Sequence, residues 1–233
     1  LTTKKYYQKD KNSYAVSIGQ FGKIISILKK NSCKKILFAG SVKKPKLSKI
    51  KLDIKGVYYI SSILKKSKFG DAAILKEIIN IFKKEGIKTV NSTFLTPELS
   101  LTKGYYSRQK ADQKDKRDIK KALKSLNKIN PYNHIQAAVS RDNNVTFEKR
   151  TGTKKMLQKI KNKKNIQNGI LIKFPKKKQD IRVDLPTVGL NTLKQSKAAG
   201  LKGIVLKHKR NIFLDRKKSI NFANKNKMFI SVK

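Results

Sequence analysis

Residues 169–206 read GILIKFPKKKQDIRVDLPTVGLNTLKQSKAAGLKGIVL and carry the pattern that decides the fold. The apolar run at 169–174 predicts a strand, and the alternating segment 179–185 predicts a second one. Residues 192–199 favour a helix, and the apolar residues 203–206 favour another short strand. Short apolar strands that alternate with helices are typical of an α/β domain, so we expect one here.

The first hundred residues show the same alternation. Two helices have clear starts: Phe21 begins an apolar face that runs to residue 30, and Gly70-Asp71 opens a helix that Gly86 is placed to end. A third helix is predicted at 56–64. Short strands are predicted at 14–17, 35–38 and 87–90. This order predicts a parallel sheet with covering helices.

Residues 96–117 interrupt the alternation, because they are polar and rich in charge. We interpret them as a linker between an N-terminal domain, residues 1–95, and a C-terminal domain, residues 118–233. The second domain is expected to begin with a helix at 118–126 and a hairpin of strands 132–140 and 145–148, joined by a turn at 141–144. A helix from about Gly152, strand 212–214, helix 217–226 and strand 228–232 complete it.

Lysine dominates the composition. The chain has 58 Lys and Arg against 14 Asp and Glu, a net charge of +44, and only seven of the basic residues are arginine. Nucleic-acid readers rely on arginine and concentrate charge on one face, whereas lysine is spread along this whole chain. We therefore favour a general lysine bias over a specific nucleic-acid surface. The charge should still attract anionic membranes and phosphates at low salt.

Other features exclude several classes of protein. No run approaches the ~20 apolar residues that span a bilayer, and the N-terminus shows no signal-peptide pattern. The single cysteine, Cys33, excludes an internal disulfide and fits a reducing compartment. His134 and His208 stand in unrelated contexts, so a Ser-His-Asp or Cys-His site has little support.

The predicted strand 179–185 carries an unusual polar face. On an extended strand Asp180, Arg182 and Asp184 share one side, and the two aspartates lie ~13 Å apart. Ligands of open α/β sheets bind at strand ends, so this row is a candidate site. The alternative is a surface strand in which the arginine only neutralises its neighbours.

Three further loops are weaker candidates. Gly40, Ser41, Val42 and Lys44 follow a predicted strand and suit phosphate contacts, although a plain strand-to-loop glycine explains them as well. Asp71 is expected to cap its helix, which leaves a role toward a ligand open. Glu148, Gly152 and Thr153 lie where a strand meets a helix start that suits an anion.

Several motifs together resemble a known family. The segments GQFGKIISILKK, ILFAGSVKKPKL, GDAAILKEIINIFKKEGIKTV, FEKRTGTKKML, GILIKFPKKKQDIRVDLPTVGLNTL and KAAGLKGIVL follow one another as in LpxI-type UDP-2,3-diacylglucosamine pyrophosphatases of lipid A biosynthesis. The resemblance extends from about Ser17 to Val232, and QDIRVDLPTVG is its most specific part.

The resemblance implies a Rossmann-like N-terminal domain and a distinct C-terminal α/β domain. It implies Mg²⁺-dependent hydrolysis of UDP-2,3-diacylglucosamine to 2,3-diacylglucosamine 1-phosphate (lipid X) and UMP. Asp184 matches the family's essential aspartate, expected to act in catalysis and, with Asp180, on the metal. The implied substrate-binding residues are Gly40, Ser41, Val42, Lys44, Gly70, Asp71, Gly152, Thr153, Lys173, Gln179, Arg182 and Thr187.

Two departures from the family pattern stand out. The chain is expected to begin after the family's first strand and Gly-Ser-Gly loop. Thr151-Gly152-Thr153-Lys154 replaces the common Glu-Gly-Thr-Asp, which removes two carboxylates near the expected site.

The expected location is the cytoplasm, with peripheral attachment to the inner membrane that holds the lipid substrate. A homo-oligomer is left open. The alternative function is a non-catalytic lysine-rich protein that binds nucleic acid or anionic membrane.

Overall fold

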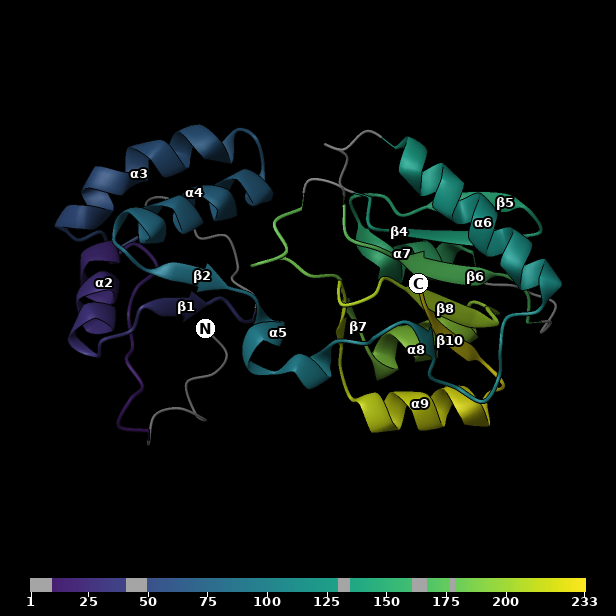
Figure 1. Ribbon diagram of the computed structural model, residues 1–233. Helices are drawn as coiled ribbons and strands as arrows, with labels where there is room; N and C mark the ends of the chain where they lie inside the picture. Colours follow the sequence, from purple (N-terminus) through teal and green to yellow (C-terminus); the bar gives the residue numbers. More distant parts are fainter. Residues whose placement is uncertain (1–9, 41–49, 130–134, 161–166, 177–178) are drawn as a thin grey trace. The chain divides into compact units, whose positions relative to one another are not determined.

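The computed structural model describes residues 10–40, 50–129, 135–160, 167–176 and 179–233, which form two compact units. Unit 1 comprises Leu1–Ser92 and unit 2 comprises Thr93–Lys233. Each contains helices packed on strands, so the protein is an α/β protein of two domains, as the sequence predicts (Figure 1).

In the described part of unit 1, helices pack on a two-stranded parallel sheet. Its elements are α2 (Phe21–Lys30), β1 (Lys35–Leu37), α3 (Ile54–Ser67), α4 (Asp71–Lys84) and β2 (Lys88–Val90). Strands β1 and β2 pair in parallel, with Ile36 opposite Thr89. The predicted helices and the two strands near 35 and 87 are therefore confirmed.

The core of unit 1 explains which residues form these helices. Phe21 and Ile25, one turn apart on α2, pack with Ile81 and Phe82 of α4, and each of these four apolar side chains is at most 5% exposed. The strand predicted at 14–17 is wrong. This segment has no regular secondary structure, and Tyr14 and Val16 are exposed, at 50% and 40%.

Unit 2 is built on a six-stranded mixed sheet with the order β3-β10-β8-β6-β4-β5. The strands β10, β8 and β6 are parallel, while β3, β4 and β5 are antiparallel to their neighbours. Strands β7 and β9 form a separate parallel pair. The elements are α5 (Ser92–Leu95), η2 (Pro97–Leu99), β3 (Gly104–Tyr105), α6 (Gln113–Lys128), β4 (Ala137–Arg141), β5 (Asn144–Phe147), α7 (Gly152–Lys159), β6 (Ile170–Lys173), β7 (Thr187–Val188), α8 (Leu190–Ala198), β8 (Gly203–Leu206), β9 (Ile212–Phe213), α9 (Arg216–Lys225) and β10 (Phe229–Val232).

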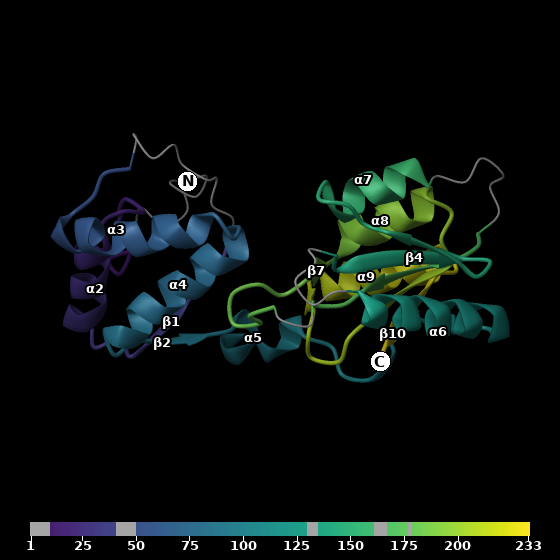
Figure 2. The ribbon, with the colours of Figure 1, turned by 90° about the horizontal axis from the view of Figure 1, so that it is seen from above.

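Helices cover both faces of this sheet, with α6 on one side and α7, α8 and α9 on the other (Figure 2). Alternate residues of each central strand point to opposite faces. In β6, Ile170 and Ile172 pack with α6, whereas Leu171 packs with the opposite helices. All three are fully buried, which is why this strand reads as a continuous apolar run.

The hairpin predicted around residues 141–144 is confirmed. Strands β4 and β5 are joined by Asp142 and Asn143, both with positive φ, as a tight hairpin turn requires. The carboxylate of Asp118 accepts hydrogen bonds from the Asn143 amide, at 2.9 Å, and from the Ser140 hydroxyl, at 2.7 Å. This buried carboxylate therefore holds α6 against the hairpin.

The segment 96–117, expected to be a linker, lies within unit 2. Its residues 104–105 form β3, which pairs with β10, and α6 already begins at Gln113. Asp112 and Asp115 form a capping box at that helix start. The polar composition of this segment thus reflects a cap and an edge strand.

Candidate functional site

Residues 179–186, which connect β6 to β7, form a turn instead of the predicted strand. The backbone amides of Val183 and Asp184 donate to the carbonyl of Asp180, at 3.2 and 3.1 Å. The Arg182 amide donates to the Asp180 carboxylate at 3.1 Å. Aspartate competes with extended structure by binding backbone two residues ahead, and that local bond prevails here over the alternating pattern. The ~13 Å separation expected for Asp180 and Asp184 on a strand is therefore wrong.

Arg182 pairs with Asp180 through two parallel bonds. Its Nε donates to Oδ1 at 2.9 Å and its Nη2 donates to Oδ2 at 2.6 Å. This bidentate pair raises the pKa of the guanidinium of Arg182 above its usual range. Arg182 already neutralises the charge of Asp180, which makes Asp180 a weaker ligand for a second cation.

Asp184 ends the turn with its backbone held and its carboxylate available. Its amide donates to Asp180, and its carbonyl accepts from Nε2 of Gln179 at 2.6 Å. Gln179 in turn accepts from the Lys176 amide at 2.9 Å, which closes the loop. The half-buried carboxylate of Asp184 makes no hydrogen bond or ion pair with any residue that the structure describes. Its backbone therefore orients it, and none of the described residues occupies it with a hydrogen bond or ion pair.

Lys173 lies beside this turn, at the carboxyl end of β6. Its Nζ donates to the carbonyl of Thr187 at 3.2 Å, which joins the end of β6 to the start of β7. Burial lowers the pKa of the Lys173 ammonium, and the negative charges of Glu148 and Asp184 act in the opposite direction. A cation is therefore close enough to feel the charge of two carboxylates at a strand end, where α/β sheets place ligands.

Glu148 is the buried carboxylate of this group, with 7% of its surface exposed. It follows β5, and its Oε1 accepts from the Gln136 amide at 2.6 Å. Its Oε2 accepts from the hydroxyl of Thr153, at 2.8 Å, in the first turn of α7. Of the expected strand-to-helix group, Glu148 and Thr153 are therefore in contact, with Gly152 beside them at the helix start.

Asn211 was missed by the sequence interpretation. Its side chain is 3% exposed, and its Nδ2 donates to the carbonyls of Lys173, at 2.9 Å, and Pro186, at 3.3 Å. Its Oδ1 accepts from the Lys207 amide at 2.8 Å. Both donors and the acceptor of one amide are thus used to join β6 to the segment that carries Asp184 and Thr187.

Comparison with known proteins decides the family. Residues 102–231 match the model of the LpxI C-terminal domain, and residues 2–99 match that of the LpxI N-terminal domain. The chain belongs to the LpxI family. It is 32% identical over 223 residues to the UDP-2,3-diacylglucosamine pyrophosphatase LpxI of Caulobacter vibrioides, a match that covers 92% of this chain and 80% of that relative.

The two LpxI domains share the predicted site residues unequally. The C-terminal domain brings together Lys173, Gln179, Asp180, Arg182, Asp184 and Thr187. Thr153 bonds to Glu148, whose charge acts on Lys173, and Gly152 precedes Thr153. The roles assigned to them from the sequence stay predictions.

Gly40, Gly70 and Asp71 lie in the LpxI N-terminal domain, whereas Ser41, Val42 and Lys44 fall outside the described residues. Gly70 is the N-cap of α4, with φ of +93°, and Asp71 is the first helical residue. The prediction that Asp71 caps this helix is therefore wrong, because glycine already supplies the left-handed backbone at that position.

The donor set for a metal in the LpxI C-terminal domain is small. No group of three or more His, Cys, Asp or Glu side chains suited to a metal occurs in the described ranges. Mg²⁺ commonly takes one or two protein carboxylates and completes its shell with phosphate oxygens and water. The open carboxylate of Asp184 fits this pattern, whereas Asp180 is held by Arg182.

Proposed function

We propose that this LpxI-family protein hydrolyses the diphosphate bond of UDP-2,3-diacylglucosamine to 2,3-diacylglucosamine 1-phosphate and UMP, a step of lipid A biosynthesis. The similarity to a UDP-2,3-diacylglucosamine pyrophosphatase over 92% of the chain carries the proposal. The geometry supports it, because the same strand end presents the carboxylate of Asp184 and the half-buried ammonium of Lys173.

The two side chains suit the two needs of diphosphate hydrolysis. The reaction needs negative charge neutralised on the phosphoryl oxygens and a water aligned with the leaving group. Lys173 would bind a phosphoryl oxygen, and Asp184 would orient the attacking water or hold Mg²⁺. When bound, Mg²⁺ would neutralise further phosphate charge. Arg182 lies two residues before Asp184 but is paired with Asp180, so its guanidinium positions the turn.

A lipid substrate also implies a place of action. None of the helices in the described part of the chain is both long and apolar enough to cross a membrane. We place the enzyme in the cytoplasm, on the inner surface of the inner membrane, where basic proteins bind anionic lipids peripherally. Nothing in the comparisons favours the alternative of a non-catalytic nucleic-acid or membrane binder.

Release of UMP from UDP-2,3-diacylglucosamine in mixed detergent micelles tests the proposal, with and without Mg²⁺. We expect UMP release that chelation of Mg²⁺ abolishes. UMP release that survives chelation would contradict the requirement for Mg²⁺ but would still support hydrolysis of the substrate. Absence of UMP release, together with binding to nucleic acid that weakens steeply as salt rises, would favour the non-catalytic alternative.

A further inference from the structure

The helix α3 of unit 1 exposes a row of large side chains. Ile54 is 90% exposed, Val57 60% and Tyr58 76%, although all three are apolar or aromatic. Their spacing of three and four residues places them on one side of the helix. Lys65, Lys68 and Phe69 continue the same side at the C-terminal end and are also exposed. We call these six residues the α3 outer face.

The opposite side of α3 is packed, which fixes the direction of the outer face. Gly56 is buried against the carbonyl of Gly19, where a Cβ would have no room. The ring of Tyr59 packs edge-on against Phe21, at 6.0 Å between ring centres, and its hydroxyl donates to Glu85 at 3.1 Å. The helix is therefore anchored to α2 and α4 and cannot turn its apolar row inward.

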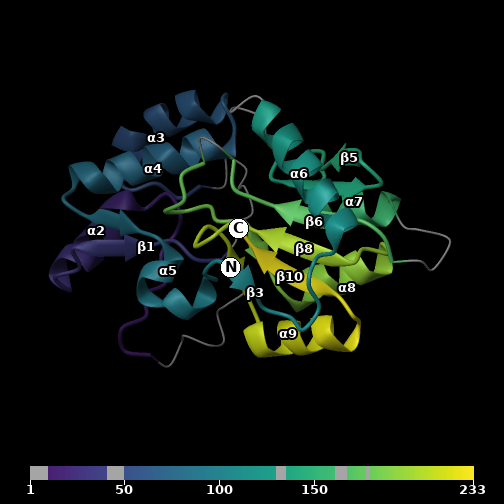
Figure 3. The ribbon, with the colours of Figure 1, turned by 45° about the vertical axis from the view of Figure 1, so that its right-hand side comes forward.

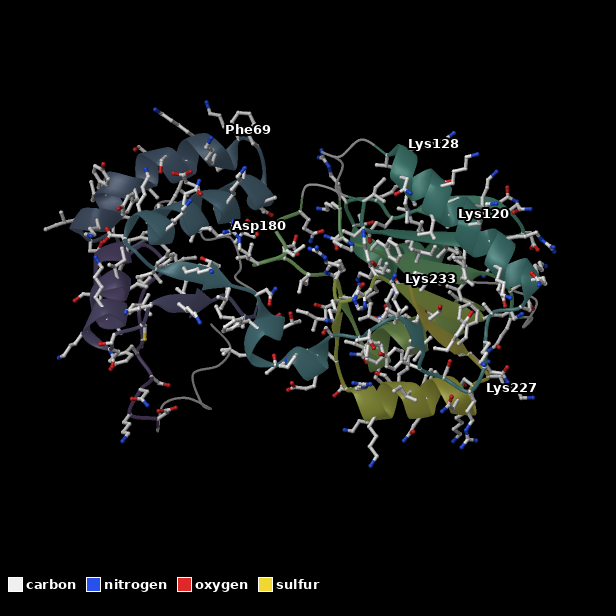
Figure 4. The ribbon with its side chains drawn as sticks, viewed as in Figure 1. Phe69, Lys120, Lys128, Asp180, Lys227 and Lys233 are labelled. Atoms are coloured by element: carbon white, nitrogen blue, oxygen red, sulfur yellow. The ribbon has the colours of Figure 1, made fainter. Side chains whose placement is uncertain are left out.

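The position of α3 within unit 1 agrees with this packing. Figures 1 and 3 both show α3 beyond α4 on the outside of unit 1, away from β1. Figure 4 labels Phe69, which is 78% exposed, at the end of this helix, with its ring standing outside the ribbon. An exposed apolar row of this size is typical of an interaction surface.

The charge near the row selects the partner. Helix α3 contains no acidic residue, and the acid just before it, Asp53, is occupied as the N-cap, where it accepts from the amides of Gly56 and Lys23 at 2.7 and 2.9 Å. Lys65 and Lys68 thus add an uncompensated positive end to an apolar helix face. An anionic surface complements this face, whereas a second copy would bring together two chains of net charge +44.

We propose that unit 1 docks on an anionic lipid surface through the α3 outer face. Ile54, Val57 and Tyr58 insert at the boundary between headgroups and acyl chains, while Lys65 and Lys68 bind lipid phosphates. Phe69 joins them as an interfacial aromatic side chain. Helices that lie in a membrane surface combine these features. The proposed hydrolysis of a lipid substrate gives this docking its biological purpose, and in that sense the inference rests on the proposed function. The binding itself does not require hydrolysis.

Co-sedimentation of the full chain with phosphatidylglycerol-containing vesicles tests the apolar part. The variant Ile54→Ser/Tyr58→Ser should lower the partition coefficient by about 5-fold or more, because it removes two inserted side chains. The control Leu95→Ser/Phe94→Ser removes one aliphatic and one aromatic side chain that are 69% and 53% exposed elsewhere. It should retain binding within about 2-fold, as expected for side chains outside the contact. Equal losses from both variants would overturn the proposal.

A matched pair of lysine variants separates the contribution of the α3 lysines from that of the total charge of the protein. Lys65→Gln/Lys68→Gln and Lys121→Gln/Lys124→Gln remove the same charge at the same spacing, the second pair from α6, where Figure 4 labels the neighbouring Lys120. We expect Lys65→Gln/Lys68→Gln to weaken binding about 5-fold or more in moderate salt, and the α6 pair to have little effect. Salt screens charges that lie more than a Debye length of ~8 Å from the lipid surface, so only lysines at the contact should matter. Identical effects would show that total charge drives binding and would contradict a specific face.

Two further measurements separate a docking defect from misfolding and from the loss of a dimer interface. Thermal unfolding and UMP release in detergent micelles should be unchanged in Ile54→Ser/Tyr58→Ser, so a docking defect and a failure of the proposed function give different results. The mass in solution should also be unchanged. A switch from dimer to monomer in that variant would assign the α3 outer face to self-association and overturn the proposal.

Discussion

Asn211 donates a hydrogen bond from its side-chain nitrogen to the backbone carbonyl of Lys173, over 2.9 Å. The same nitrogen also donates to Pro186, two residues after Asp184. One buried amide therefore sets the distance between the strand that carries the Lys173 ammonium and the turn that carries the Asp184 carboxylate. It positions both groups without being placed to touch the substrate.

The variant Asn211→Asp tests this positioning role. A carboxylate keeps the acceptor for the Lys207 amide but turns two donor contacts into oxygen–oxygen contacts, which should lower the unfolding free energy by about 1–3 kcal/mol. We expect kcat to fall about 10-fold or more with a smaller change in KM, because small displacements cost catalysis more than binding. Asn226→Asp is the control, since that amide donates to the Phe222 carbonyl at the end of α9. A normal kcat in Asn211→Asp would remove the positioning role.

Most of the described helices could be predicted from the sequence, although α6 begins five residues before its predicted start and α5 was not predicted. Helix α2 has the predicted bounds, and the hairpin at Asp142-Asn143 forms where turn residues separate two apolar runs. The two wrong strands look favourable in sequence, since 14–17 contains a short apolar run and 179–185 alternates apolar and polar residues. A strand also needs a neighbour with which to pair, and that partner is not visible in the local pattern. At 179–185 the bond from Asp180 to its own chain prevails.

The site could be predicted only in part, for the same reason. Gln179, Asp184 and Lys173 lie in one recognisable segment, and the structure brings them together. The contacts of Asn211 reach residues 25 and 38 positions away, so no spacing rule indicates them. The bidentate partner of Arg182 is Asp180, although both neighbouring aspartates are equally spaced from it in sequence.

Replacing Lys173 tests whether its half-buried ammonium binds the diphosphate. Lys173→Gln should raise KM for the nucleotide lipid by about 10-fold or more, because a charge-assisted bond to phosphate contributes ~1.5–3 kcal/mol. The control is Lys207→Gln, which removes a lysine whose Nζ lies 5.8 Å from the centre of the Phe174 ring beside the end of β6. An equal rise in KM for both variants would indicate general electrostatic attraction instead of a specific contact.

Glu85 predicts a pH dependence for the stability of unit 1. Hydrogen bonds from Lys55 and Lys29 lower the pKa of this carboxyl from 4.5 to about 2 in the folded protein. Because the folded pKa is depressed, the stabilisation is fully present above pH 4.5 and is lost as pH falls through about 2. Both lysines are about half exposed, so we expect a contribution of only about 1–2 kcal/mol.

Thermal unfolding of Glu85→Gln across this range checks the sign. The variant should be less stable than the original protein at pH 7, and the difference should shrink toward zero near pH 2. Glu77→Gln removes one carboxylate from α4 without this network and serves as the control. A difference that stays constant from pH 7 to 2 would show that the ion pairs are not its cause.

Asp184→Asn decides whether the open carboxylate performs the chemistry. The substitution keeps the backbone bonds of the turn, and it removes a carboxylate without a hydrogen bond in the described structure, so the melting temperature should hardly change. We expect kcat to fall about 100-fold or more, with KM little affected, because orienting water or a cation acts mainly in the transition state. Asp180→Asn is the matched control. It weakens the two bonds to Arg182, so it should lower stability more than Asp184→Asn does and turnover much less. Near-normal UMP release by Asp184→Asn would falsify its catalytic role, and a turnover defect confined to Asp180→Asn would transfer that role to the paired aspartate.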